Sequence, residues 1–402
     1  MKAFKTELDP NNVQATALRQ HCGAGRWAYN WGIERIKEAA DAGLRWPTAI
    51  DLHKQLNLLK GTDALPWAYA VSKCAFQEAL RNLDTAIKNM RASRKGERKG
   101  AKMGFPKRKT RKKGLGTCRF TGIIKVFSGE VQLPRIGLVR LKEHGYIPNG
   151  KYAQATISEY AGHWFVSITA ATEVDFPELT GAVIGVDVGI KTLATCSDKA
   201  TFANPKALAA KTKQLRRWQR RLSRRVKGSK NRAKARTQVA RLHKKVADVR
   251  RDAHNKAARA IVNQHPSIIV IENLNVKGMF KNRKLAKALS DAALGQLGRI
   301  LTYMAEDAGI EVRRAVRFFA SSKLCSCCGW KHETLTLADR TFICGDCGLV
   351  IDRDLNAAIN LKNTVSSTGI YACGDRVSPR ASNGGLEAVV AETGILSQMS
   401  MF

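Results

Sequence analysis

The sequence is short of acidic side chains. Its 402 residues contain 33 Asp and Glu against 69 Lys and Arg, which gives a formal net charge of +36 and a pI of about 10.2. A chain this basic repels itself unless an anionic partner neutralises it, which excludes most ordinary metabolic enzymes and leaves nucleic acid or an acidic membrane surface as partner. Because 44% of the residues are hydrophobic, the length suffices for two or three domains with their own cores.

Long apolar runs are also missing. No stretch approaches the roughly 20 apolar residues that span a bilayer, and the first ten residues lack the apolar core of a signal peptide. We therefore expect an intracellular protein without a membrane partner. Histidines are few, and the eight present are not spaced as metal ligands or interpreted as catalytic.

The positive charge is concentrated in two segments. Residues 91–114 hold 12 Lys or Arg and one acid, and residues 206–251 hold 19 and one acid, so the two segments carry +29 of the net charge. The second segment predicts a long helix, with Leu215, Trp218, Leu222 and Val226 as a thin apolar stripe. Because that stripe lacks the bulky face of a membrane-surface helix, binding of nucleic-acid phosphates is favoured over membrane binding.

Hydrophobic periodicity divides the chain into three regions. Residues 11–91 repeat apolar side chains every three or four positions and predict a helical domain. Residues 118–176 predict short strands of a small antiparallel sheet or barrel, to which the opening KAFKTEL can add a strand. From residue 181 onward buried-type strands alternate with helices, including one over 289–309 that ends at Gly309. The overall class is therefore α+β with several domains, and the polar segment 366–402 is expected to be a disordered tail.

Five of the ten cysteines lie within 23 residues of one another. Two C-x-x-C-G pairs, Cys325 with Cys328 and Cys344 with Cys347, have the spacing that presents four thiolates to Zn²⁺. Such a closed site is structural rather than catalytic. Cys327 could replace Cys328 as a ligand. We favour Cys328, because it gives both pairs the same C-x-x-C-G spacing. Five scattered cysteines are interpreted as small core residues or bystanders: Cys22, Cys74, Cys118, Cys196 and Cys373.

Three acids stand at the ends of predicted elements. Asp187 follows an apolar strand, Glu272 ends the run SIIVIE, and Asp354 begins a short helix. Each alone has an ordinary interpretation, as a turn former, a strand-end charge and a helix N-cap. If neighbouring strands and a packed helix bring them together, the carboxylates repel unless divalent cations lie between them. Two Mg²⁺ ions roughly 4 Å apart can clamp the attacking and leaving oxygens of a phosphodiester displacement, and Mg²⁺ prefers such oxygen ligands.

Several blocks, taken in order, resemble the TnpB family of transposon-encoded, RNA-guided DNA nucleases related to type V CRISPR effectors. The blocks extend over about residues 1–365. They are LDPNNVQATALRQHCGAGRWAYNWGIE, VQLPRIGLVRLKEHG, GVDVGIKTLAT, IVIENLNVKGM, RFFASSKLCSCCGW with CGDCG, and DRDLNAAINL.

The resemblance implies a fold and a set of boundaries. A helical recognition domain with a basic linker (11–114) would be inserted in a wedge β-barrel (1–10 and 115–180). An RNase H-like RuvC domain (181–323 and 351–365) would carry an inserted zinc ribbon (324–350). The family's catalytic carboxylates correspond to Asp187, Glu272 and Asp354, with Asp352 two residues earlier in the same block.

The resemblance also implies partners and an activity. We expect a prokaryotic cytoplasmic protein, acting at the nucleoid, that binds a guide RNA from the transposon end and cuts double-stranded DNA beside a short adjacent motif. Mg²⁺, or Mn²⁺, would occupy the acidic site and Zn²⁺ the cysteine site. Phosphates would be bound by basic side chains of both segments, namely Lys107, Arg108, Lys109, Arg111, Arg216, Arg217, Arg220, Arg221, Arg224 and Arg225. The alternatives are an RNA-guided repressor that does not cut and a transposase that acts without RNA.

Overall fold

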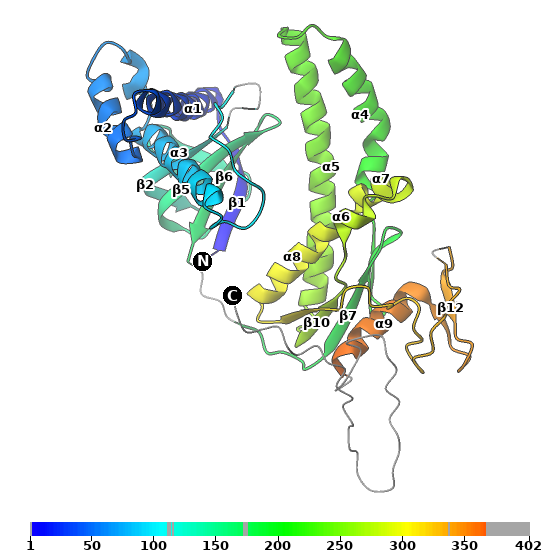
Figure 1. Cartoon of the computed structure of the whole chain (residues 1–402). Helices are drawn as coiled ribbons and strands as arrows, with labels where there is room; N and C mark the ends of the chain where they lie inside the picture. The colour runs from blue at the N-terminus through cyan, green and yellow to red at the C-terminus, as the bar shows by residue number, and fades with distance from the viewer. Residues whose placement is uncertain (1, 111–113, 115, 172–175, 337, 367–402) are drawn as a thin grey trace. The chain divides into compact units, whose positions relative to one another are not determined.

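The computed structural model describes residues 2–110, 114, 116–171, 176–336 and 338–366 (Figure 1). The chain forms two compact units, one from residues 1–173 and 213–245 and the other from 174–212 and 246–402. Residues 367–402, which hold nearly all of the predicted tail together with Cys373, lie outside the described residues. Among the helices described, none combines the length and the apolar character needed to cross a membrane.

Six strands close a barrel in the first unit, in the order β1-β4-β3-β2-β5-β6. All pairs are antiparallel, and alternate residues of each strand turn inward, as Trp164, Val166 and Ile168 do. The predicted barrel is confirmed, and the opening segment supplies a strand that pairs with β4 and β6. The strands are β1 (Lys2–Asp9), β2 (Thr117–Phe127), β3 (Glu130–Leu133), β4 (Gly137–Leu141), β5 (Gly150–Tyr160) and β6 (His163–Ala170).

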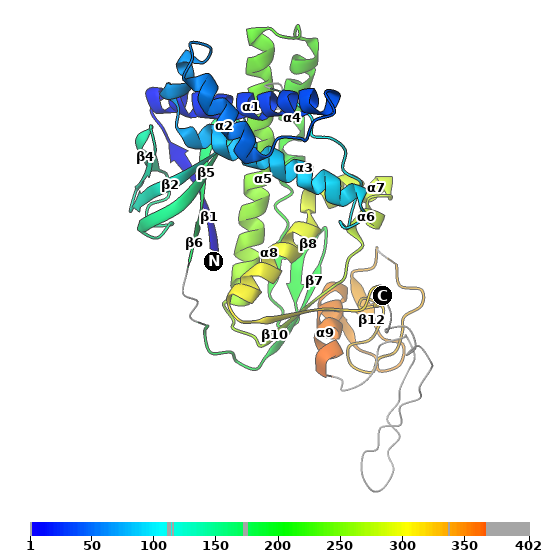
Figure 2. The ribbon, with the colours of Figure 1, turned by 60° about the vertical axis from the view of Figure 1, so that its left-hand side comes forward.

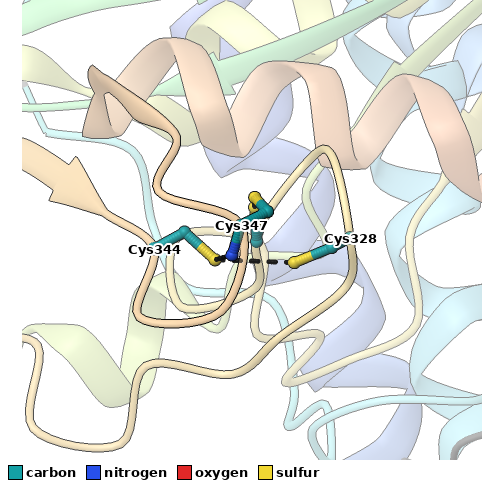
Figure 3. Close-up of side chains that lie close together, drawn as sticks. Cys328, Cys344 and Cys347 are labelled. Atoms are coloured by element: carbon teal, nitrogen blue, oxygen red, sulfur yellow. Dashed lines mark hydrogen bonds between the residues drawn. The ribbon is translucent and has the colours of Figure 1, made fainter.

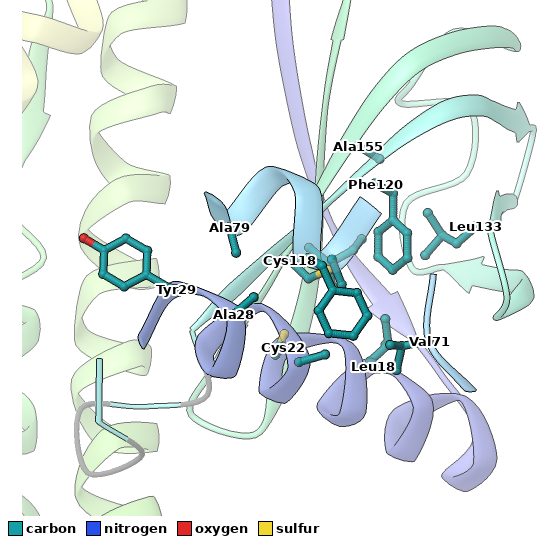
Figure 4. Close-up of a cluster of buried hydrophobic side chains, with 14 of the residues drawn as sticks. Leu18, Cys22, Ala28, Tyr29, Val71, Ala79, Cys118, Phe120, Leu133 and Ala155 are labelled. Atoms are coloured by element: carbon teal, nitrogen blue, oxygen red, sulfur yellow. The ribbon is translucent and has the colours of Figure 1, made fainter. Parts of the chain in front are cut away.

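The helical region lies in sequence between β1 and β2. It consists of α1 (Asn12–Asp41), α2 (Ala49–Lys60), the 3-10 helix η1 (Pro66–Ala70) and α3 (Lys73–Arg94). Side chains of Asn11 and Thr48 cap the first two helices, each in a capping box. Phe76 and Phe120, both fully buried, share one core between α1, α3 and the barrel. Figure 4 shows Leu133 and Ala155 of the barrel beside Phe120, and Leu18 and Cys22 of α1 on the helical side of this core.

The scattered cysteines within the described residues are core side chains. Cys22, Cys74, Cys118 and Cys196 are all buried, as predicted. Burial raises the pKa of the Cys22 and Cys196 thiols to about 12, so both stay protonated and unreactive at neutral pH.

A five-stranded sheet forms the second unit, in the order β11-β10-β7-β8-β9. β10 (Ile268–Ile271) runs parallel to β7 (Val183–Val188) and β11 (Glu311–Arg314), whereas β7, β8 (Thr192–Cys196) and β9 (Thr201–Ala203) form antiparallel hairpins. The helices α5 (Lys230–Val262) and α8 (Leu294–Asp307) cover one face, and α9 (Arg353–Ser366) packs on the other beside β7 (Figure 2).

The prediction of one long helix over residues 206–251 is wrong. The segment forms two helices, α4 (Ala207–Arg224) and α5 (Lys230–Val262). The guanidinium of Arg232 donates to the carbonyls of Leu222 and Arg225, both at 2.7 Å, and so closes the turn between the helices. Val226 lies in this turn and is 76% exposed, so it does not belong to the apolar stripe.

The helix predicted over 289–309 is also interrupted. α6 (Val276–Met279) is followed by α7 (Arg283–Ala292) and α8 (Leu294–Asp307), with Ala293 in the left-handed region between α7 and α8. The break lets Leu289 and Leu294 both reach the core, although residues five apart on a continuous helix point in different directions. As predicted, Gly309 follows the end of α8 with a positive φ.

Candidate active site and metal centre

Asp187 lies on β7, and Glu272 directly follows β10, the adjacent parallel strand. Val186 of β7 pairs with Ile271 of β10, so each acid is the next residue along the chain, at the same edge of the sheet. The Asp187 carboxyl shares a hydrogen bond with Glu272. Burial, followed by the charges of Glu272 and Asp354, raises the pKa of Asp187 well above its ordinary value.

The pKa of Glu272 is also raised, chiefly by burial. Ser321 opposes this rise, because its hydroxyl donates to Oε1 of Glu272 at 2.8 Å. A proton shared by Asp187 and Glu272 would relieve the repulsion between the two carboxylates. Such a pair of oxygen donors suits a hard divalent cation.

Asp354 lies in the first turn of α9, and its interpretation as the N-cap is wrong. Asp352 is the cap, because its Oδ1 accepts the backbone N–H groups of Asp354 and Leu355 at 2.9 and 3.0 Å. The Asp354 side chain is therefore available to the sheet, where its charge acts on both other acids. It is also paired with the guanidinium of Arg353 at 3.2 Å.

The three carboxylates do not form a tight cluster. In the part of the chain that the structure describes, four cysteines are the one group of at least three Cys, His, Asp or Glu whose ligand atoms all lie within 4.8 Å of one another. The three acids therefore interact through their charges without sharing one tight ligand cluster, and the ion pair with Arg353 partly neutralises Asp354.

α9 reaches the sheet at Gly185. A Cβ atom at this position would lie 2.0 Å from the carbonyl oxygen of Ala358 and 2.5 Å from the amide nitrogen of Lys362, both backbone atoms of α9. A glycine is thus required for the helix to approach β7 closely, and the contact lies two residues before Asp187. The position of Asp354 relative to Asp187 depends on it.

Two buried asparagines of α9 hold the segment that leads into the first cysteine pair and the residue after Cys325. Asn356 donates to the carbonyl of Leu324 at 2.6 Å and accepts from the N–H of Ser326 at 2.9 Å. Asn360 donates to the carbonyls of Ser321 and Leu324, both at 2.7 Å. The same helix therefore positions Asp354, the Glu272 partner Ser321 and the metal loop.

Sequence reasoning missed these supporting residues. A signal was present in DLNAAINL, where two asparagines four residues apart share a helix face with apolar neighbours. Nothing comparable marks Ser321, because its partners Glu272 and Asn360 are distant in sequence. Arg353 is the immediate neighbour of Asp354, but the sequence does not show that the two side chains pair.

Cys325, Cys328, Cys344 and Cys347 form the metal centre, and Figure 3 labels the last three of them. The Sγ atoms of Cys325 and Cys347 lie 3.6 Å apart, and those of Cys328 and Cys344 lie 3.5 Å apart. A tetrahedral zinc with Zn–S bonds of about 2.3 Å needs sulfurs roughly 3.8 Å apart, so the thiols fit Zn²⁺. Cys327 is exposed and outside the cluster, which favours Cys328 as the ligand.

Backbone geometry prepares these thiols for metal. Gly329 and Gly348 follow the two pairs with φ of +76° and +72°, a conformation that side chains disfavour. Burial opposes ionisation of Cys344, but the N–H groups of Cys347 and Asp346 donate to its sulfur and lower its pKa to about 6. Fully buried Phe342 supports the cluster from β12 (Thr341–Ile343), which pairs with β13 (Val350–Asp352).

Loss of the metal should loosen α9 as well as the cysteine loops. Chelation or Cys344→Ser is expected to remove the bound zinc, of about one ion per chain, and to lower the melting temperature, because binding energy at a structural zinc site is folding energy. DNA cleavage should fall with it, since Asp354 lies seven residues after Cys347. Zinc analysis by mass spectrometry, melting and cleavage are the measurements.

Cys327→Ser is the matched control and should keep zinc, melting temperature and cleavage. A Cys344→Ser protein that melts and cuts like the wild type would contradict the coupling between the zinc site and Asp354.

The predicted phosphate-binding side chains differ in their surroundings: some are exposed to solvent, and others contact a neighbouring side chain. Six arginines around α4 are exposed: Arg216, Arg217, Arg220, Arg221, Arg224 and Arg225. Lys107 is also exposed, whereas Arg108 pairs with Glu34 at 2.9 Å. The ammonium of Lys109 lies 4.0 Å from the ring centre of Tyr29, and Arg111 lies outside the described residues. Phosphate binding by these residues stays a prediction.

The basic helix α4 is fixed at its start by a residue that the sequence did not reveal. Asp291, only 7% exposed, accepts the backbone N–H groups of Leu208 and Ala209 at 2.8 and 2.9 Å. A carboxylate at a helix N-terminus satisfies unpaired donors and complements the helix dipole. It also lies 3.7 Å from Arg250 of α5.

Known families and proteins match most of the chain. The OrfB_IS605 family model, described as a probable transposase, matches residues 167–283. A Cas12f1-like TNB domain matches 295–361, and a helix-turn-helix domain of OrfB_IS605 matches 1–44.

Curated relatives match more than nine-tenths of the chain. A "Putative RNA-guided DNA endonuclease" of Streptomyces pristinaespiralis is 34% identical over 383 residues, covering 94% of this chain and 92% of its own. The "Putative RNA-guided DNA endonuclease InsQ" of Escherichia coli is 28% identical, covering 94% and 95%. A solved structure described as "Cryo-EM structure of CRISPR-Cas12f Ternary Complex" matches 87% of this chain and 82% of its own at 14% identity, with a TM-score of only 0.38. With a relative 34% identical along nearly its full length, the chain belongs to the TnpB/OrfB_IS605 family.

Proposed function

We propose that this protein is an RNA-guided, Mg²⁺-dependent endonuclease that cuts double-stranded DNA beside a short adjacent motif. One observation carries the proposal: acids from β7, β10 and α9 interact at one edge of a sheet, in a chain whose relatives are named RNA-guided DNA endonucleases. The five-stranded sheet with α9 would be the RNase H-like RuvC domain, the cysteine loops its zinc ribbon, and the barrel and α1–α3 the wedge and recognition domains.

Asp187 and Glu272 would hold the metal ions, and Asp354 would complete the site. Their carboxylate oxygens are the donors that Mg²⁺ and Mn²⁺ accept, and their mutual repulsion supports a cation between them. When bound there, two such ions supply an activated nucleophile and neutralise charge on the phosphate during an in-line displacement.

The remaining groups of the site would orient these acids. Ser321 holds Oε1 of Glu272 and leaves the other carboxylate oxygen for a ligand. Asp187 and Glu272 would release their shared proton when a cation enters, so cation binding should weaken as the pH falls. Arg353 would hold the Asp354 carboxylate in place through the ion pair between them at 3.2 Å.

Guide RNA from the transposon end and target DNA would be bound through their phosphates. Exposed arginines of α4 and the basic residues 91–114 supply positive charge, and contacts between such charges and phosphates do not distinguish one base from another. Sequence selection is therefore assigned to base pairing between guide and target.

Sequencing of RNA that copurifies with the protein tests this function, followed by cleavage of plasmids that carry the matched target beside randomised flanks. A discrete RNA and cutting beside one short motif, dependent on Mg²⁺, are expected. A discrete RNA with binding but no cutting would favour the repressor, and strand joining without any discrete RNA would favour the transposase.

A further inference from the structure

The loop between β11 and the first cysteine pair, residues 315–321, presents an aromatic side chain to solvent. Phe318 is 86% exposed. The N–H of Phe319 donates to the carbonyl of Val316 at 3.1 Å, which closes a four-residue turn with Phe318 at its third position. Phe318 has φ of +69°, whereas Arg317 before it does not have a positive φ, as in a type II turn.

A phenylalanine at that position of the turn is strained. Type II turns take Gly or Asn there, because a bulky side chain is strained in the left-handed region. The exposed ring recovers little of this cost by packing. The folding of the turn therefore does not account for a phenylalanine at this position.

The rest of the loop is fixed to the last residue of β10 and to Glu272, which follows that strand. At one end the N–H of Ala315 donates to the carbonyl of Ile271 at 2.9 Å. At the other end Ser321 donates to Glu272 and its carbonyl accepts from Asn360. The Phe318 ring is thus presented from a held backbone next to an acid of the candidate active site.

A cavity of about 220 Å³ lies beside this loop. Its walls include Glu272 and Phe318 together with Asn273, Met279 and Phe319. The cavity is smaller than the roughly 300–1,000 Å³ of ordinary small-molecule sites, and most of its lining is apolar. The cavity suits one flat, largely apolar group that belongs to a larger molecule bound near the Glu272 carboxylate.

We propose that Phe318 stacks on an unpaired base of the DNA strand whose phosphate lies at Asp187 and Glu272. The inference rests on the proposed nuclease function and adds how the strand is held. Stacking on an aromatic ring accepts any base, as a cut directed by a guide requires, and Arg317 beside it is exposed and can neutralise a neighbouring phosphate. A base held here keeps the strand single and in register with the acids.

The test uses the full-length protein with its copurified RNA and a single-stranded DNA that carries 2-aminopurine at successive positions. Binding is measured in an Asp187→Asn background and cleavage in the otherwise wild-type protein. Phe318→Gly should abolish 2-aminopurine quenching at one position and weaken binding about 10- to 100-fold. The same change should leave the melting temperature equal or higher, because glycine relieves the strained turn. Phe318→Trp should retain quenching and binding.

Tyr303→Ala, which removes another exposed aromatic side chain of the second unit, is the control and should change neither quenching nor binding. Phe318→Gly protein that binds and cuts like the wild type would overturn the proposal. So would a Phe318→Trp protein as defective as Phe318→Gly, or quenching of an RNA strand in place of DNA. Wild-type protein that quenches DNA but never cuts it would support stacking while refuting the nuclease function.

Discussion

Replacing Asp187 with asparagine should lower DNA cleavage by at least about a thousandfold and also stabilise the metal-free protein. Cleavage is lost because several kcal/mol of charge stabilisation by bound cations depends on the ionised carboxylate. The fold gains because asparagine can still donate to Glu272 without adding a second buried negative charge. Plasmid cleavage with Mg²⁺, and melting with and without it, measure the two effects.

The stability difference has a defined dependence on pH. Because the pKa of Asp187 is raised in the folded protein, its protonated form contributes stability at low pH, and that stability is lost as the pH rises through the raised value. The free energy of unfolding of Asp187→Asn should therefore exceed that of the wild type most at high pH, by at least about 1 kcal/mol. This corresponds to a melting temperature higher by roughly 2–4 °C. Added Mg²⁺ should narrow the gap by stabilising only the wild type.

Glu306→Gln, at an exposed position of α8, is the control and should affect neither activity nor stability. Cleavage by Asp187→Asn at the wild-type rate would refute the assignment of the site. A metal-free variant that is less stable than the metal-free wild type at high pH would refute the claim that the buried charge of Asp187 destabilises the fold.

Gly185→Ala should disrupt both folding and cleavage through a single methyl group. The added Cβ would lie within 2.5 Å of two backbone atoms of α9, and a helix backbone cannot turn aside as a side chain can. We expect a loss of at least about 3 kcal/mol, at or above the usual range for overpacking, and a melting temperature lower by roughly 6–12 °C. A shift of α9 by about 1 Å would also move Asp354 and lower cleavage by about a hundredfold.

Gly298→Ala in α8 makes the same chemical change where no other atom lies within 4 Å of the new Cβ. It should be neutral or stabilising, because alanine favours helix more than glycine does. Cleavage by Gly185→Ala protein within threefold of the wild type, measured below its melting temperature, would show that the approach of α9 does not position the acids.

Short sequence patterns predicted the structure correctly where neighbouring residues alone determine it. The C-x-x-C-G spacing indicated the cysteine cluster because two short loops are enough to aim four thiols. Alternation of apolar residues indicated the barrel, since each strand has one buried face. The break between α4 and α5 was missed, because Arg232 closes that turn from the far side of it.

The sequence alone determined which groups can carry the chemistry: three acids at element ends, four paired cysteines, and two basic segments that hold most of the charge. Only the tertiary structure decided how these groups are held. Ser321 meets Glu272 across 49 residues, and Asn360 meets Ser321 across 39. Asp352, not Asp354, caps α9, and Gly185 admits that helix to the sheet. Such contacts depend on packing between distant segments, which a pattern of neighbouring residues does not contain.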